Sequence, residues 1–178
     1  MSKRLKIFPK NFLNETAFKN IFLDQLGTMH CALTHLSSNI ESLSLLTSFS
    51  DLRFALEETQ EDTFKQLVRI EKIAETFKMT ITEKSCLGVK AIMEETLLAI
   101  GKTEKKSFER DLAIIFYMHV IKHIEVAGYR TLVISANKLN YDSAKILLTE
   151  NMDEAIDNDK LFMLISDNYA LKSGDLKD

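Results

Sequence analysis

Hydrophobic residues recur at intervals of three and four along most of the chain, which is the period of an amphipathic α-helix. The first stripe begins at Phe18, ends at Leu43 and leaves one face of the segment continuously apolar. Between these two residues it contains Phe22, Leu26, Met29, Leu33, Leu36 and Ile40. An irregular arm over residues 1–13 precedes it, and Asn14 is the expected N-cap. The pattern predicts a first long helix.

The same period predicts three more long helices, over about 52–77, 107–139 and 143–172. A shorter helix is expected over about 83–100, with Thr82 as its cap, and residues 174–178 should form a loose tail. The sequence lacks the alternation of apolar and polar residues that is typical of strands. Its single proline, Pro9, precedes the first predicted helix, so no predicted helix is broken by proline. We therefore expect an all-α fold and one domain over 1–178, an up-and-down four-helix bundle with one short extra helix in the crossover.

Composition and charge narrow the class of protein further. The chain is 46% hydrophobic with a net charge of −3, so it can form a core and lacks the basic surface that nucleic acid requires. Charged residues interrupt every long apolar run, and the N-terminus lacks the apolar stretch of a secretory signal, so neither a membrane span nor export is expected. Two cysteines, Cys31 and Cys86, are too few for a disulfide scaffold and suit a reducing compartment. These features indicate a cytoplasmic protein.

The inward lines of the last three long helices carry polar residues at their centres. In the second helix these are Thr59, Thr63 and Gln66. The third helix presents Ile115, Met118, Lys122, Glu125, Tyr129 and Leu132, and the fourth Leu148, Met152, Ala155, Asp159, Phe162 and Tyr169. Lys122, Glu125, Asp159 and Asp62 are thereby expected at similar depth. Carboxylates gathered inside a helical bundle commonly bind two metal ions, although the same residues could lie hydrated on the helix flanks.

Other chemistry is sparsely represented. Phosphate-binding glycine loops, CxxC pairs, a GxSxG elbow and a HExxH pair are missing, so a hydrolase, kinase or dinucleotide enzyme has no support. His119 and His123 lie four residues apart on one helix face and could chelate zinc. With no acidic partner at matching spacing on that face, the alternative is a pair of partly exposed histidines without a metal.

Four segments together resemble the YciE/YciF ferritin-like family, a domain family of unknown function. Residues 118–132, MHVIKHIEVAGYRTL, resemble its signature VEHYEIAGYGTL, and residues 22–36, 51–63 and 144–161 are similar to three further family segments in the same order. The resemblance extends from about Phe18 to Ser166. It implies a ferritin-like four-helix bundle, a homodimer, a di-metal site and an association with bacterial stress responses.

The chain departs from the family at positions where a potential metal ligand is expected. Leu33, Thr59, Lys122 and Ala155 replace a glutamate, a histidine, a glutamate and a glutamate, whereas Glu125 and Asp159 match. We therefore expect a vestigial, metal-free site with no catalytic residue, formed by Leu33, Thr59, Asp62, Lys122, Glu125, Ala155 and Asp159. In it the ammonium group of Lys122 takes the place of a metal and pairs with Glu125, Asp159 or Asp62.

Two functions follow from this pattern. The first is a non-catalytic, dimeric structural or interaction protein, whose contact surface could be the flank formed by Val89, Ile92, Met93 and Leu97, unless that flank packs on the bundle. The second is an oxidase-like or metal-handling protein that binds iron or manganese through a rearranged site. Its candidate ligands are Glu58, Asp62, His123, Glu125, Glu154 and Asp159.

Overall fold

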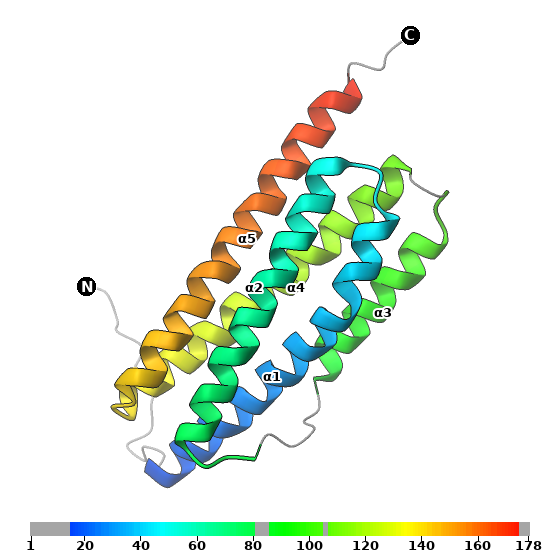
Figure 1. Ribbon diagram of the computed structural model, residues 1–178. Coiled ribbons are helices and arrows are strands. Elements are labelled where there is room, and N and C mark those ends of the chain that lie inside the picture. The colour runs from blue at the N-terminus through cyan, green and yellow to red at the C-terminus, as the bar shows by residue number, and fades with distance from the viewer. Residues whose placement is uncertain (1–14, 81–85, 105–106, 175–178) are drawn as a thin grey trace, which may run out of the picture.

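The computed structural model describes residues 15–80, 86–104 and 107–174 (Figure 1). Over these residues the chain forms helices and no strand, which confirms the all-α expectation. The helices are α1 (Glu15–Leu46), α2 (Ser50–Thr76), α3 (Leu87–Gly101), α4 (Phe108–Lys138) and α5 (Asp142–Gly174). The predicted caps Asn14 and Thr82, the arm over 1–13 and residues 175–178 of the tail lie outside the described residues, and Gly174 belongs to α5 rather than to the tail.

The four long helices form a bundle in which α1 packs on α2, α2 on α5, α5 on α4, and α4 on α1. The short helix α3 lies outside this ring, against α4 and α1. It returns the chain to the end of the bundle at which α2 began, so α2 and α4 run in the same direction and every neighbouring pair of long helices is antiparallel (Figure 1). The sequence predicted one crossover that contains a short helix, and α3 is that helix.

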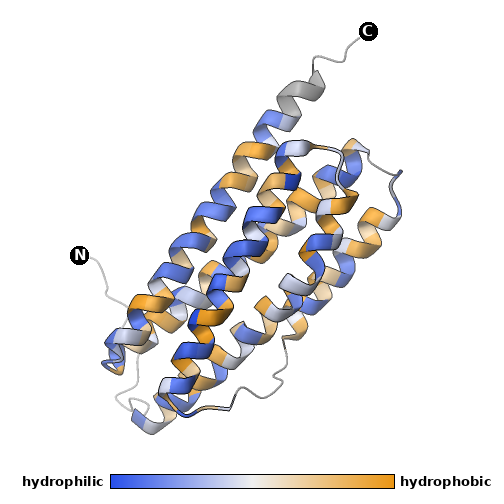
Figure 2. Ribbon diagram, viewed as in Figure 1, coloured by the Kyte–Doolittle hydropathy of each residue, from blue (hydrophilic) through white to orange (hydrophobic). Residues whose placement is uncertain are grey.

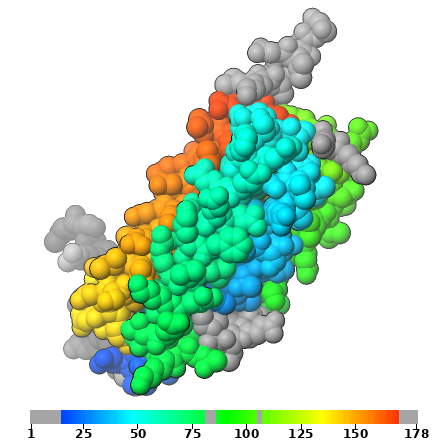
Figure 3. Space-filling view, in the orientation of Figure 1, coloured from blue at the N-terminus to red at the C-terminus, as the bar shows by residue number. Residues whose placement is uncertain are grey.

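Apolar residues form two core clusters, one toward each end of the bundle. The first is built around Phe22, Leu33, Ile70 and Leu148, and the second around Leu36, Leu56, Ile115 and Phe162. Hydrophilic residues lie on the outer faces of the same helices, between hydrophobic turns (Figure 2). The space-filling view shows the outer face of α2 uncovered, between α5 and α1 (Figure 3). The polar centre of the predicted inward lines falls between the two clusters.

The connection between α1 and α2 is fixed by a buried carboxylate rather than by a side-chain N-cap. The N-cap of α2 is Phe49, whose side chain makes no capping hydrogen bond. Asp111 near the start of α4 accepts hydrogen bonds from the backbone N–H of Ser48 and Phe49 and from the hydroxyl groups of Ser48 and Tyr169. This carboxylate therefore joins the α1–α2 turn to α4 and α5 at one end of the bundle.

The two cysteines, whose small number suggested a reducing compartment, are paired in this structure. Cys31 on α1 and Cys86, the N-cap of α3, form a disulfide with their Cα atoms 5.9 Å apart. Spacing along the sequence gave no sign of this pairing, because only the docking of α3 on α1 brings the two residues together. Because Cys31 and Cys86 are paired, they give no support for a reducing compartment.

The flank of α3 considered above as an interaction surface faces the bundle instead. Val89 packs in a small cluster with Ala32 and Cys86, and Met93 is buried in the second core cluster. Ile92 packs partly buried against the same cluster, and only Leu97 remains exposed. The apolar residues of this flank are therefore explained by packing on the bundle.

Helix α4 is long and apolar enough, by length and composition alone, to cross a membrane. The core helix of a bundle passes the same test, and α4 packs here against α1, α3 and α5. Its inward face carries the buried Lys122 and Glu125. The apolar character of α4 is accounted for by its place in the bundle.

Candidate functional site

A polar layer separates the two apolar clusters at the middle of the bundle. Its buried members come from α2, α4 and α5, whereas α1 contributes only leucines at this level. They are Thr59, Thr63 and Gln66 from α2, Lys122, Glu125 and Tyr129 from α4, and Asn151 and Asn158 from α5. Polar groups are costly in a core unless they are hydrogen-bonded, so the partners of each group decide what the layer can do.

The only charged pair fully enclosed in this layer, among the described residues, is formed by Lys122 and Glu125. The Lys122 ammonium donates to Glu125 Oε2 at 2.9 Å, and the two residues are 0% and 2% exposed. The second carboxylate oxygen, Glu125 Oε1, is buried without a hydrogen-bond partner. Because the residues are three apart on one helix, both side chains leave α4 on the same face. The pair therefore puts one positive and one negative charge where water does not reach.

Tyr129 extends the layer toward the first apolar cluster. Its hydroxyl group donates to Gln66 Oε1 at 3.1 Å. Burial, together with the negative charge of Glu125, raises the pKa of the Tyr129 phenol well above its ordinary value. The phenol is thus kept neutral and acts as a hydrogen-bond donor to the amide.

Asn158 joins α5 to α2 on the other side of the layer. Its amide oxygen lies 3.2 Å from the Thr59 hydroxyl group, and its amide nitrogen donates to Asp62 Oδ2 at 3.1 Å. Asp62 is only partly buried and also accepts a hydrogen bond from Lys65 at 2.8 Å. Asp62 is therefore paired at the rim of the layer and does not contact Lys122.

Arg69 forms a second polar connection between α2 and α5. Its guanidinium group binds Glu154 through two hydrogen bonds of 2.7 Å and contacts Asn151 Oδ1 at 3.1 Å. The hydrogen bonds with Glu154 raise the pKa of Arg69, which stays charged. Glu154 is thereby neutralised by an arginine at the edge of the bundle.

The structure separates the predicted site residues into two groups. Leu33, Thr59, Lys122, Glu125 and Ala155 are fully or almost fully buried. Asp62 and Asp159 lie on the flanks, with 17% and 15% of their side chains exposed. Of the three partners considered for Lys122, only Glu125 is bonded to it.

The predicted inward line of α5 was wrong at two positions. Met152 is only partly buried, although it packs against the first apolar cluster, and Asp159 is partly buried on the flank, whereas Asn151 and Asn158 point into the core. Asn151 follows Leu148 by three residues and Asn158 follows Asn151 by seven, and that heptad-like spacing was the signal in the sequence that could have found them. Asparagine is mostly exposed in proteins, so a search for apolar stripes does not select it.

Most of the chain, residues 17–172, matches the model of a domain of unknown function, DUF892. The chain belongs to this family. Protein YciF of Escherichia coli (strain K12) is 29% identical to it over 143 residues, which are 80% of this chain and 86% of YciF. The resemblance to the YciE/YciF family is thereby confirmed.

Solved structures of relatives share the fold of this DUF892 protein. The crystal structure of the E. coli stress protein YciF matches with a TM-score of 0.82 and 26% identity over 87% of this chain and 98% of that one. YcfI, a suggested structural protein of Rhodopseudomonas palustris, matches with a TM-score of 0.78 and 21% identity over 87% of this chain and 96% of that one. The second likeness shows the fold alone.

The residues at the centre of this DUF892 bundle do not fit a di-metal centre. Such centres in helical bundles take carboxylates from all four helices, and Leu33 and Ala155 supply none. Glu125 is the only carboxylate in the buried layer of the described residues, and an ammonium group already lies 2.9 Å from it. Across the described part of the chain, no three His, Cys, Asp or Glu side chains are spaced as ligands of one metal ion.

The ligand set considered for iron or manganese is dispersed. Glu58 is exposed, the His123 side chain is 71% exposed, and Glu154 is bound to Arg69. Asp62 forms an ion pair with Lys65 on the flank between α2 and α5. Asp159 forms one with His119 on the flank between α4 and α5. Only Glu125 of that set lies in the core.

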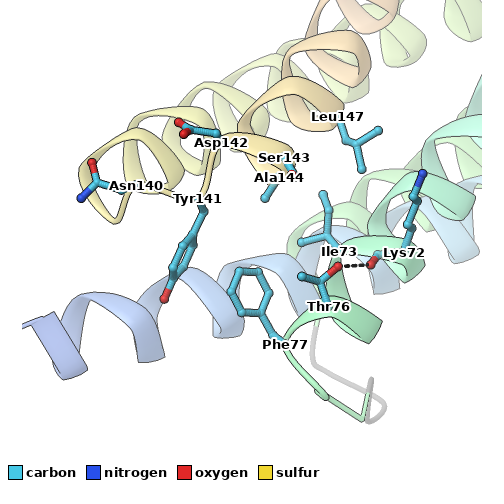
Figure 4. Close-up of a pocket in the computed structure, with 10 residues that line it drawn as sticks. All are labelled: Lys72, Ile73, Thr76, Phe77, Asn140, Tyr141, Asp142, Ser143, Ala144 and Leu147. Carbon is cyan, nitrogen blue, oxygen red and sulfur yellow. Dashed lines mark hydrogen bonds between the residues drawn. The ribbon is translucent and has the colours of Figure 1, made fainter.

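A surface pocket of about 240 Å³ lies away from the polar layer, between the end of α2 and the start of α5 (Figure 4). Phe77, Tyr141 and Leu147 line it, and the Thr76 hydroxyl group in its wall donates to the Lys72 carbonyl oxygen at 3.0 Å. None of the predicted site residues reaches it. The pocket shows no arrangement of acid, base and nucleophile.

Proposed function

We propose that this DUF892 protein is a non-catalytic, ferritin-like bundle whose di-metal site has degenerated, and that it serves as a stress-associated structural or interaction protein. The observation that carries the proposal is the buried Lys122–Glu125 pair. YciF, its relative, is named a stress protein, and YcfI a suggested structural protein.

Charge balance supports a metal-free centre. In a di-metal centre the cations offset the repulsion and desolvation of several carboxylates. Here one ammonium group offsets one carboxylate, and the surrounding layer consists of neutral groups such as Thr59, Gln66 and Asn158. A second cation would meet the positive charge of Lys122 at short range, which is unfavourable in a low dielectric. The layer is thus already neutral without a metal ion.

The ferritin-like assignment is supported by the connections between helices. Bundles of this class have two antiparallel helix pairs joined by one long crossover. The α1–α2 and α4–α5 pairs and the crossover through α3 have this organisation. The polar layer lies in the bundle core between facing helices, which is also where metal sites of such bundles are built.

A homodimer is the assembly that we propose. Large apolar side chains are exposed on the outer face of α2, which is uncovered in this single chain (Figure 3). Phe54, Phe64 and Val68 are each more than half exposed. Phe64 and Val68 lie one helical turn apart on this face, and this exposed apolar pair is the contact that we propose for the dimer. Light scattering coupled to size-exclusion chromatography should give a molar mass twice that of one chain. The variant Phe64→Glu should lower this mass toward that of the monomer.

For location we propose the cytoplasm. Thiol reductants of that compartment would keep Cys31 and Cys86 reduced, whereas an oxidising compartment would retain their disulfide. Alkylation of thiols at the moment of cell lysis, followed by mass measurement, distinguishes the two. Two alkylated cysteines are expected, and an intact disulfide would contradict the proposed location.

Metal analysis is the experiment that tests the main proposal. The purified chain is incubated with ferrous iron and with manganese, desalted, and measured by elemental mass spectrometry. We expect less than about one iron or manganese ion per ten chains, since the core offers a single carboxylate that is already paired. Binding near two ions per chain would overturn the proposal.

The variant Glu125→Gln identifies where any bound metal lies. It removes the one carboxylate of the core while keeping the shape of the side chain. Iron or manganese that binds to the natural chain and is lost in Glu125→Gln would come from the core and would count against a degenerate site. Metal that is unaffected by this change binds elsewhere.

A further inference from the structure

A second cluster of ionisable side chains lies on the flank between α4 and α5, apart from the buried pair. His119 Nδ1 lies 2.8 Å from Asp159 Oδ1, and His123 Nε2 lies 3.8 Å from Asp159 Oδ2. The two imidazole rings are close to parallel, with centroids 6.5 Å apart. The carboxylate from α5 thus contacts both histidines of α4.

From this arrangement we infer a surface site for one borderline divalent cation of the zinc class, held by His119, His123 and Asp159. Two imidazoles and one carboxylate form a common ligand set for zinc, with water completing the coordination. The inference goes beyond the proposed function, because it concerns a different place and different residues from the Lys122–Glu125 pair.

Helix geometry supplies two of the ligands. Residues four apart lie on the same face of a helix, so His119 and His123 can reach one ion from consecutive turns. The third ligand depends on the register of α5 against α4, which places Asp159 beside both rings. Two ligand atoms that bind one zinc ion are separated by about 3 to 3.5 Å, since each lies about 2.1 Å from it. The observed separations are 2.8 Å, just below that range, and 3.8 Å, just above it, so the three side chains as placed do not yet surround one ion.

A small side-chain adjustment is needed before a cation can enter. As placed, His119 and Asp159 share a hydrogen bond, and none of the described residues forms a ready-made group of three metal ligands. The cation would replace the proton between Nδ1 and Oδ1, and the His123 ring would turn toward it. The His123 side chain is 71% exposed, so its rotation meets little steric resistance.

The exposure of the three residues favours an open site rather than a closed structural one. The side chains of His119 and Asp159 are 20% and 15% exposed, and the His119 ring packs edge-on against Phe162, which keeps its side of the cluster apolar. The other side faces solvent through His123. Water therefore has access to the remaining coordination positions, as in zinc sites that keep an exchangeable ligand.

Zinc titration of the full-length chain tests the inference. The metal-free protein is titrated with zinc chloride in a calorimeter, and cobalt(II) is added in parallel as a spectroscopic substitute. We expect one zinc ion per chain and a visible cobalt spectrum typical of nitrogen and oxygen ligands. His123→Ala should weaken zinc binding by at least about 10-fold, and Asp159→Asn by a similar factor.

The chain offers a matched control in His30. This histidine also contacts a carboxylate, Glu71, at 3.3 Å, and the structure gives that pair no contact with a second histidine. His30→Ala should leave the affinity for zinc unchanged. A natural chain that takes up no zinc, or a His123→Ala variant that binds as tightly as the natural chain, would overturn the inference. Because the His123 side chain is largely exposed, its removal leaves the fold intact even if His119→Ala does not.

The outcomes separate this site from the core. Loss of zinc in His123→Ala with no effect of Glu125→Gln supports the flank site and leaves the metal-free core in place. Zinc lost in Glu125→Gln and retained in His123→Ala would contradict the flank site and would also count against the degenerate core.

Discussion

Replacement of Lys122 by methionine should destabilise the protein strongly, because it leaves the Glu125 carboxylate buried without a counter-charge. Methionine approximates the length of lysine, so the change adds little cavity cost. Two unit charges 2.9 Å apart attract each other by about 6 kcal/mol at an effective dielectric constant of about 20. Relaxation and proton uptake by the carboxylate offset part of that loss. We expect unfolding to become easier by about 3–5 kcal/mol.

Urea denaturation followed by far-ultraviolet circular dichroism measures this change, as a lower midpoint at an unchanged slope. Lys160→Met is the matched control. Lys160 lies 3.0 Å from Asp157, three residues away on one helix as in the buried pair, but both side chains are largely exposed. Exposed pairs contribute little, so this variant should unfold close to the natural chain.

The double variant Lys122→Met/Glu125→Leu separates charge from packing. Removal of both charges should restore most of the stability lost in Lys122→Met, because no buried charge then lacks a partner. A Lys122→Met variant as stable as the natural chain would show that the ammonium group is not enclosed. A double variant that is no better than Lys122→Met would show that the loss comes from packing and not from charge.

Three further changes test other parts of the structure. Asp111→Ala should cost about 3 kcal/mol in urea denaturation, because it leaves buried donors of the α1–α2 turn unpaired; a change near zero would mean that the turn does not need this carboxylate. In Tyr129→Phe the lost hydrogen bond with Gln66 should cost about 1 kcal/mol near neutral pH. That deficit should shrink as the pH rises above about 10, where the unfolded phenol ionises and the raised pKa keeps the folded one neutral; a deficit that stays constant contradicts the raised pKa. Under oxidising conditions, Cys31→Ser should lower the free energy of unfolding by about 4 kcal/mol, since the disulfide with Cys86 spans 55 residues; addition of reductant to the natural chain should reproduce the loss.

The bundle was predictable because its signals are local. Spacings of three and four on each long helix identify the inward face without knowledge of any neighbour, as for Leu33 on α1 and Phe162 on α5, both fully buried. Helix ends were predicted to within about two residues where turn or capping signals are strong, as at Ser107, whose hydroxyl group accepts from Arg110 N–H. Helix α3 begins at Leu87 with Cys86 as its N-cap, whereas the predicted start near Glu83 lies outside the described residues.

The sequence by itself determined that Lys122 and Glu125 contact each other. Lys122 and Glu125 are three residues apart on one helix, so their common face follows from the helical period alone, and their contact needs no partner element. The likeness to the family was also readable, because it lies in linear segments such as residues 118–132.

Only the tertiary structure decided which residues of different helices meet. Asn158 rather than Asp159 points into the core, because packing against α2 and α4 sets the rotation of α5 about its own axis. That rotation places Asp159 between His119 and His123, and the docking of α3 pairs Cys31 with Cys86. Helical periodicity fixes the direction of a side chain about its own axis but carries no information on the rotation and axial register between helices. Those two quantities are set by side-chain packing across the whole bundle.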